Sequence, residues 1–311
     1  MSSSHFSNPI HSIGDIHGDL DALLRILSGI NLIDTQGNWA GGSATLVMMG
    51  DLVDRGPDSF GVMNHVMTLE TQAEQAGGQV VCLLGNHEIM VLSGNFQFFR
   101  AREVLELENI WMGDRHGLDA IFRGDSIWAT WLRQRPAWVK MGDSIFVHAG
   151  IEKWALEWGF DQLNSTMQDW AAHLQGVAPE PADDNFWLTT DGGGGPLWSR
   201  SLIVRSGSTP HDPELPELIA RFLSMHQAKR LVAGHNPTKN IEYQIAWPHP
   251  QLGDQVAVID TGISMAIGGR LSALIIDGNH LESRYFERGA ESLPLTSTLR
   301  TRYLSQLDVY R

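Results

Sequence analysis

The stretch Thr45-Leu-Val-Met-Met-Gly-Asp-Leu-Val-Asp-Arg-Gly56 places an apolar run directly before a glycine and a set of charged residues. Short apolar runs that contain β-branched residues are typical of buried strands. The same order recurs along the chain, because further apolar runs lead into polar pairs that contain glycine or histidine. These runs span residues 10–13, 45–49, 80–84, 144–147, 231–233 and 256–259. The sequence therefore predicts several strands, each with polar side chains at its carboxyl end.

Helical patterns lie between several of these runs. Apolar residues recur at helical spacing over residues 20–27, 57–77, 163–174 and 215–223. Strands that alternate with helices predict an α/β fold. In open sheets of this class, ligands bind at the carboxyl ends of the strands. We therefore expect the separate polar motifs to form one site.

Two segments depart from this alternation. The segment from about residue 95 to 140 contains tryptophan and arginine and reads as a helical insertion, a candidate cap over the site. Residues 176–196 read as a flexible loop, and their glycine run lacks the Gly-Lys-Ser/Thr of a phosphate-binding P-loop. No domain boundary or internal repeat is evident, so the sequence predicts a single domain over residues 1–311. The polar stretch after Arg288 is expected to pack along the surface.

Charge and composition exclude several classes of protein. The 36 acidic and 22 basic residues give a formal net charge of -14, which disfavours binding to a nucleic-acid backbone or an anionic membrane. The single cysteine, Cys82, rules out an intrachain disulfide. Neither a secretory signal nor an apolar run long enough to cross a bilayer is present, so we expect a cytoplasmic protein. Nothing in the sequence indicates a partner subunit.

The polar motifs combine carboxylate, amide and imidazole groups. The candidate metal ligands are Asp15, His17, Asp51, Asn86, His148 and His235. Oxygen and nitrogen donors without thiolate suit a borderline divalent cation such as manganese, iron or zinc. One carboxylate can bridge two cations, and two cations about 3.5–4 Å apart can clamp the attacking and leaving oxygens of a phosphoryl displacement.

Five motifs in this order resemble the calcineurin-like metallophosphoesterases and, within them, the phosphoprotein phosphatases. The motifs are Gly14-Asp-Ile-His-Gly18, Gly50-Asp-Leu-Val-Asp-Arg-Gly56, Gly85-Asn-His-Glu88, His148-Ala-Gly150 and Gly234-His235. The resemblance runs from Gly14 to about Gly269 and implies a β-sandwich flanked by helices, with the site at one edge. The motif His148-Ala-Gly150 and the segment Gly195-Pro-Leu-Trp-Ser-Arg200 are closer to the bacterial-type branch, which includes the Shewanella-like phosphatases.

The resemblance also implies a role for each motif residue. Asp15, His17 and Asp51 would hold one metal ion. Asp51 would bridge to a second ion, which Asn86, His148 and His235 would complete. The two ions are expected to be manganese, with iron or zinc as alternatives, and a hydroxide between them would attack phosphorus.

Four further residues would handle the substrate. His87 would be the general acid, oriented by Asp54, and Arg55 would bind phosphate. Arg200 is a second candidate for phosphate binding. A purely local role is the alternative for Arg55, which could instead form an ion pair with Asp54 or Asp58. A further residue, Asp260, could either stabilise the turn at a strand end or contact a histidine that binds metal.

These residues predict a metal-dependent phosphomonoesterase. A phosphorylated protein is the leading substrate class, through phosphoserine/threonine, phosphotyrosine or both, and a small phosphoester is the simpler alternative. A dinucleoside polyphosphate or other nucleotide hydrolase would use the same metals. His148-Ala-Gly-Ile151 followed by Trp154 also resembles the symmetrical diadenosine tetraphosphatases, although an acid at Asp54 favours the phosphatases. A non-catalytic phosphate-binding module is a third possibility, but no predicted ligand is missing.

Overall fold

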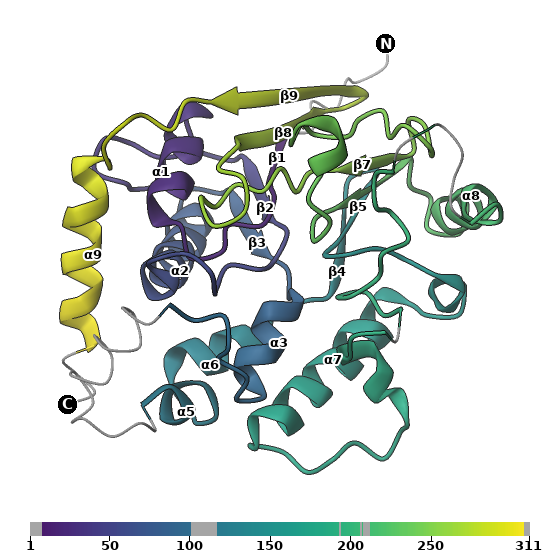
Figure 1. The fold of residues 1–311 in the computed structure, drawn as a ribbon, viewed down its shortest axis with the longest axis horizontal. Helices are drawn as coiled ribbons and strands as arrows, with labels where there is room; N and C mark the ends of the chain where they lie inside the picture. The colour runs from purple at the N-terminus through teal and green to yellow at the C-terminus, as the bar shows by residue number, and fades with distance from the viewer. Residues whose placement is uncertain (1–7, 101–116, 193, 206, 208–211, 308–311) are drawn as a thin grey trace.

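The computed structural model describes residues 8–100, 117–192, 194–205, 207 and 212–307. Its strands form two sheets (Figure 1). The five-stranded sheet has the order β3 (Gln79–Cys82), β2 (Thr45–Met48), β1 (Ile10–Ile13), β8 (Leu271–Asp277) and β9 (His280–Phe286). The four-stranded sheet has the order β4 (Trp138–Met141), β5 (Ser144–Val147), β6 (Arg230–Ala233) and β7 (Val256–Val258). This arrangement confirms the predicted α/β sandwich.

The two sheets enclose one apolar core, and a second core lies outside them. Along β2, Val47 belongs to the core between the sheets, whereas Leu46 and Met48 belong to the outer core under the helices. Phe146 and Val232 of the other sheet meet Val47 in the inner core. Because successive side chains of a strand point to opposite faces, strands buried on both faces are continuously apolar. That explains the short apolar runs in the sequence.

The helices cover the outer faces and the lower edge of the sandwich in the view of Figure 1. Helices α1, α2 and α9 lie beside the five-stranded sheet, and α3, α5, α6 and α7 lie below the sheets. Their bounds are α1 Leu20–Gly29, α2 Ser59–Gln75, α3 Asn86–Leu92, α5 Gly117–Phe122, α6 Ile127–Arg133, α7 Phe160–Gln175, α8 Leu215–Met225 and α9 Pro294–Leu307. Three short 3-10 helices span Lys153–Leu156, Asn185–Thr189 and Lys239–Ile241. Within the described residues, no helix has the length and apolar character needed to cross a membrane.

Strand direction brings the polar motifs together. Strands β1, β2 and β3 are parallel to one another, as are β5, β6 and β7. The motifs that begin at Gly14, Gly50 and Gly85 follow the first set, and those at His148 and Gly234 follow the second. All five loops therefore leave the sandwich at carboxyl ends of parallel strands, as predicted.

The structure differs from the expectations in three places. Part of the expected helical insertion, residues 101–116, lies outside the described residues, and its far end, Trp138–Lys140, belongs to β4, which pairs antiparallel with β5. The expected loop over residues 176–196 contains the 3-10 helix at Asn185–Thr189. The polar C-terminal stretch forms α9, which packs against α1 and α2.

Candidate active site

The loops that carry the motifs adopt backbone conformations that side chains rarely take. Five residues with a side chain have a positive φ here: His17 (46°), Asp51 (49°), Asp54 (70°), Arg55 (65°) and His235 (60°). Such conformations cost free energy, persist only where surrounding contacts enforce them, and cluster at functional sites. Five of the nine non-glycine residues with a positive φ in the described part of the chain are thus residues that the sequence selected as candidates.

Glu88 holds two of these loops together. Its buried carboxylate accepts hydrogen bonds from the backbone N–H groups of Asp51, Leu52 and Gly85, each at 2.8 Å. Burial and, next, the nearby Asp51 carboxylate raise the pKa of Glu88 to about 7, although the three N–H groups act in the opposite direction. Glu88 thus ties the loop after β2 to the loop after β3. Glu88 belongs to the motif Gly85-Asn-His-Glu88, but this role was not predicted from the sequence.

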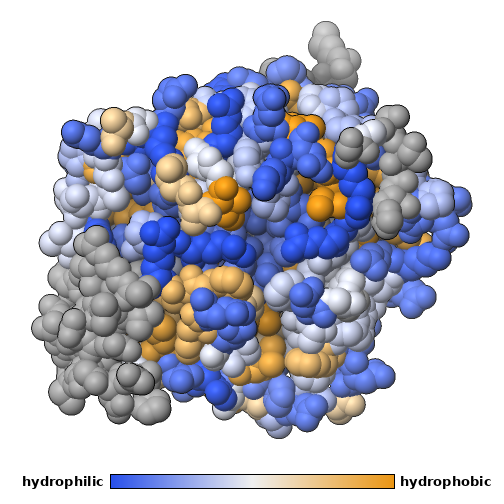
Figure 2. All heavy atoms as spheres, viewed as in Figure 1, coloured by the Kyte–Doolittle hydropathy of each residue, from blue (hydrophilic) through white to orange (hydrophobic). Residues whose placement is uncertain are grey.

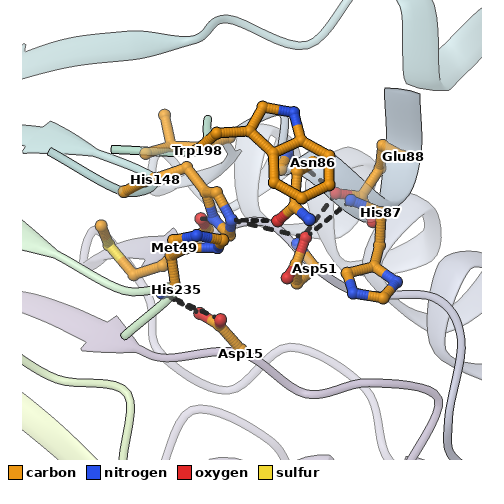
Figure 3. Close-up of polar contacts among 12 residues, drawn as sticks. Asp15, Met49, Asp51, Asn86, His87, Glu88, His148, Trp198 and His235 are labelled. Carbon is orange, nitrogen blue, oxygen red and sulfur yellow. Dashed lines mark hydrogen bonds and ion pairs between the residues drawn. The ribbon is translucent and has the colours of Figure 1, made fainter. Parts of the chain in front are cut away.

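Asp51 lies at the centre of two groups of metal-ligand atoms (Figure 3). One group comprises His17, Asp51 and His87, and the other comprises Asp51, His148 and His235. Within each group the ligand atoms lie within 4.8 Å of one another. The two oxygens of Asp51 face different groups, because Oδ2 lies 3.7 Å from His17 Nε2 and Oδ1 lies 3.4 Å from His148 Nε2. A carboxylate so placed can bridge two cations.

Backbone carbonyl groups orient two of the histidines. Nδ1 of His17 donates to the Val53 carbonyl at 3.1 Å, and Nδ1 of His148 donates to the Met49 carbonyl at 2.6 Å. With Nδ1 protonated, each ring presents the lone pair of Nε2 to Asp51. Burial lowers the pKa of His17 to about 3 and lowers those of His148 and His235. All three rings are therefore neutral near pH 7, the state that binds metal.

The surroundings of Asn86 provide a test of whether a cation fits. The terminal amide atom of Asn86 that faces the cluster lies 3.0 Å from both His235 Nδ1 and His148 Nε2, and 3.2 and 3.3 Å from the Asp51 oxygens. As an oxygen, this atom is surrounded by acceptors, an arrangement that a cation stabilises. Without a cation, a rotation of the amide lets its NH₂ donate to them. In addition, buried His235 Nε2 has no hydrogen-bond partner among the described residues. This donor set fits two borderline divalent cations.

Asp15 lies beside these groups and belongs to neither. Its carboxylate accepts the His235 backbone N–H, at 2.9 and 3.2 Å to its two oxygens, and Figure 3 places it below His235 and apart from Asp51. Burial, together with the carboxylates of Asp260 and Asp51, raises the pKa of Asp15 well above its usual value. A nearby cation would offset this repulsion. Asp15 therefore remains a predicted ligand, both oxygens of which also contact the backbone N–H of His235.

Asp260 has the turn contact expected of a strand-end residue. Its Oδ1 accepts the Gly262 N–H at 2.9 Å, and its buried Oδ2 has no partner among the described residues. Burial raises its pKa to about 7. The side chain also lines the cavity described below, and its carboxylate interacts with that of Asp15.

The proposed acid and its partner are in direct contact. His87 Nδ1 lies 2.6 Å from Asp54 Oδ2, and Nε2 lies 3.2 Å from Nη2 of Arg55. Burial by itself lowers the pKa of His87, but Asp51 and Asp54 outweigh burial and raise it. A protonated imidazole held by a buried carboxylate is suited to donate a proton to a leaving group.

A cavity of about 580 Å³ joins these groups. Its lining includes candidate ligands, both candidate phosphate-binding arginines and several apolar side chains, namely His17, Asp51, Arg55, Asn86, His87, Met90, Phe98, Trp198, Arg200, His235 and Ile267. Figure 2 shows hydrophilic residues across the middle of this face, between apolar patches. Arg200 is exposed, and its Nη1 donates to Asn236 Oδ1 at 3.1 Å. Neither Phe98 nor Asn236 was predicted, because neither belongs to a motif with a recognisable spacing.

Comparison with known proteins identifies the family. The model of the calcineurin-like phosphoesterases matches residues 9–239, which is most of the chain. The chain belongs to the calcineurin-like phosphoesterase family. Its two ligand groups and this membership make it a metal-dependent hydrolase of phosphoesters.

Relatives within the calcineurin-like phosphoesterases include named phosphatases. Shewanella-like protein phosphatase 2 of Arabidopsis thaliana is 27% identical over 292 residues, which cover 81% of this chain and 71% of that protein. The solved cold-active protein-tyrosine phosphatase of a psychrophilic Shewanella species superposes with a TM-score of 0.70 at 26% identity, covering 90% of this chain and 80% of that one. A symmetrical bis(5'-nucleosyl)-tetraphosphatase from Ralstonia nicotianae is 33% identical over 147 residues, 47% of this chain and 43% of that protein.

Proposed function

We propose that this protein is a two-metal phosphomonoesterase that removes phosphate from phosphorylated proteins. The observation that carries the proposal is the sharing of Asp51 between two groups of potential ligand atoms, one of which includes His87, whose Nδ1 contacts Asp54. His17 and Asp51 would hold one cation with Asp15, and Asn86, His148 and His235 would hold the other with Asp51. Manganese is the cation we favour. When bound, the cations supply positive charge that makes a water more acidic and stabilises phosphate oxygens.

The side chains of the protein supply the remaining functions. Arg55 presents a planar guanidinium at the cavity and can bind two phosphate oxygens at once. Arg200 lines the same cavity. His87 lies beside Arg55, so a phosphate held by Arg55 places its leaving oxygen within reach of Nε2. By accepting from Nδ1, Asp54 stabilises the doubly protonated ring of His87, in which Nε2 also carries a proton that can pass to the leaving oxygen.

The acid favours a monoester over a dinucleoside polyphosphate. An alkoxide or phenoxide leaves poorly without a proton, whereas a leaving phosphate group is a far weaker base. A buried acid pair is therefore most useful for an ester of serine, threonine or tyrosine. The relatives of similar length named as protein phosphatases support the same substrate class. The relative named as a tetraphosphatase matches about half of the chain and makes nucleotide hydrolysis the second candidate.

A turnover assay on one purified sample tests the proposal. We expect manganese-dependent release of phosphate from phosphoserine/threonine or phosphotyrosine peptides, loss of turnover after chelation, and about two cations per chain by elemental analysis. Asp51→Asn should abolish turnover and lower the cation content. Turnover confined to diadenosine tetraphosphate would replace phosphoprotein by nucleotide as the substrate class. Bound metal without turnover of any substrate would favour a binding module.

Leaving-group dependence tests the acid. His87→Asn should slow hydrolysis of an alkyl phosphate by about 10²–10⁴-fold, and should slow p-nitrophenyl phosphate less because its leaving group needs less protonation. Asp54→Asn should give the same pattern more weakly. Full activity of His87→Asn toward the alkyl ester would exclude His87 as the acid.

A further inference from the structure

Phe98 is an exposed aromatic ring at the candidate active site. It lines the cavity and has 37% of its surface exposed. Its neighbour Phe99 is 8% exposed and packs against Phe60 and Phe122 in an aromatic cluster of the core. Because this buried cluster already anchors the segment, the exposure of the adjacent Phe98 ring is not explained by core packing.

The ring of Phe98 faces the two groups that handle the phosphate ester. Its centroid lies 5.2 Å from the centroid of the His87 ring and 4.7 Å from the guanidinium carbon of Arg55. Arg55 is the phosphate-binding candidate and His87 is the candidate acid. The ring therefore lies beside the position where the phosphate of a bound substrate is joined to the leaving group.

The position of Phe98 determines which part of the substrate its ring contacts. A phosphate held by Arg55 with its leaving oxygen at His87 directs the substituent of that oxygen past His87. Phe98 borders His87 there, so the substituent runs along the exposed part of the ring. An aryl group can stack on a phenylalanine ring, whereas the single CH₂ of a serine side chain offers little surface.

We propose that Phe98 is a specificity-determining residue that contacts an aromatic ring on the leaving oxygen and makes the site prefer aryl over alkyl phosphate esters. This inference rests on the proposed function, and it adds the residue that selects among phosphorylated side chains. Phe98 also has a second contact, because its carbonyl accepts the Arg55 N–H at 2.8 Å. That backbone contact is retained when the side chain is changed, so substitution isolates the ring.

The test compares two peptides of identical sequence that carry phosphotyrosine or phosphoserine. The measured quantity is the ratio of their kcat/KM values. Phe98→Ala should lower this ratio about tenfold, Phe98→Leu should lower it less, and Phe98→Trp should preserve it. Phe186→Ala is the matched control, because Phe186 is 44% exposed, does not line the cavity and has its ring centroid 5.1 Å from that of Trp170. The ratio should be unchanged in this control.

The possible results distinguish a failure of this inference from a failure of the proposed function. An equal loss on both peptides would overturn the inference and leave Phe98 as a residue that positions Arg55. An unchanged ratio in Phe98→Ala would also overturn it. Failure of the wild-type protein to hydrolyse either peptide would instead refute the proposed function. A binding measurement adds an independent readout: benzylphosphonate should lose affinity relative to ethylphosphonate in Phe98→Ala, and an unchanged affinity ratio would overturn the inference.

Discussion

The two arginines of the cavity are held in different ways. Arg55 sits on a strained loop, its N–H donates to Phe98, its carbonyl accepts from Arg100 at 2.6 Å, and its guanidinium lies over the Phe98 ring. Arg200 is exposed and its side chain is held by one hydrogen bond to Asn236. It also borders a second cavity of about 470 Å³.

This difference shows how a fold can make one phosphate-binding group rigid and leave another adjustable. A fixed guanidinium is positioned before the substrate arrives, which favours stabilisation of charge in the transition state. An exposed guanidinium must lose side-chain entropy when it binds, so part of its contribution is cancelled. Arg55 should therefore matter far more than Arg200.

The largest effect is expected for Arg55→Ala. Removal of a fixed phosphate-binding group should lower kcat/KM by about 10²–10³-fold. Arg55→Lys should recover little, because an ammonium lacks the planar fork that matches two phosphate oxygens. Steady-state kinetics on a phosphopeptide provide the measurement. A loss of less than tenfold would show that Arg55 is not the principal phosphate-binding residue.

Arg200→Ala should have an intermediate effect. We expect about a tenfold loss in kcat/KM, mostly through a higher KM, because an exposed charged hydrogen bond contributes modestly. The same kinetic series measures it. A loss equal to that of Arg55→Ala would contradict the contrast between a rigid and an adjustable group.

Arg100→Ala should have a small effect on kcat/KM, because Arg100 acts by positioning Arg55. Loss of the hydrogen bond from Arg100 Nε to the Arg55 carbonyl should lower kcat/KM about threefold and should change nothing further in an Arg55→Ala background. Arg221→Ala, another exposed arginine on α8, is the control. Additive losses in the double variant would mean that Arg100 acts independently.

The smallest effect on activity is expected for His65, which lies away from both arginines, between α2 and α9. Its buried ring contacts the Tyr303 hydroxyl at 2.9 Å, and burial lowers its pKa to about 4. Because the folded-state pKa lies below the ordinary value, the unfolded chain takes up a proton first as the pH falls. The contribution of neutral His65 to the free energy of unfolding is therefore fully present above about pH 6.5 and is lost as the pH falls toward 4.

Urea unfolding at pH 7.5 and pH 5 measures the pH-dependent contribution of His65 to the free energy of unfolding. The free energy of unfolding should fall between these pH values by about 2 kcal/mol more in the wild type than in His65→Gln. Kinetics of His65→Gln at pH 7.5 should match those of the wild type. An equal pH dependence in the two proteins would show that His65 titrates normally in the folded state.

Most of the architecture could be predicted from local patterns. The apolar runs at residues 10–13 and 144–147 coincide with β1 and β5, and the other predicted strands agree within two residues. Strands β4, β8 and β9 escaped prediction. The burial pattern of β9 alternates little, and its last six residues mix apolar and charged side chains, so its signal is weak. Helix α9 was missed for a related reason: its sequence has almost no apolar face.

The chemical types of the site residues followed from the sequence, since motifs at strand ends carry the donors that a divalent cation and a phosphate require. The contacts among them did not. The two faces of Asp51 and the amide of Asn86 among acceptors depend on loops from both sheets, and the position of Phe98 beside His87 depends on the path of the chain after α3. Short-range patterns determine which residues end a strand, because alternation and turn chemistry act locally. Distances between side chains on different strands are determined by how the two sheets pack, and so only the tertiary structure specifies them.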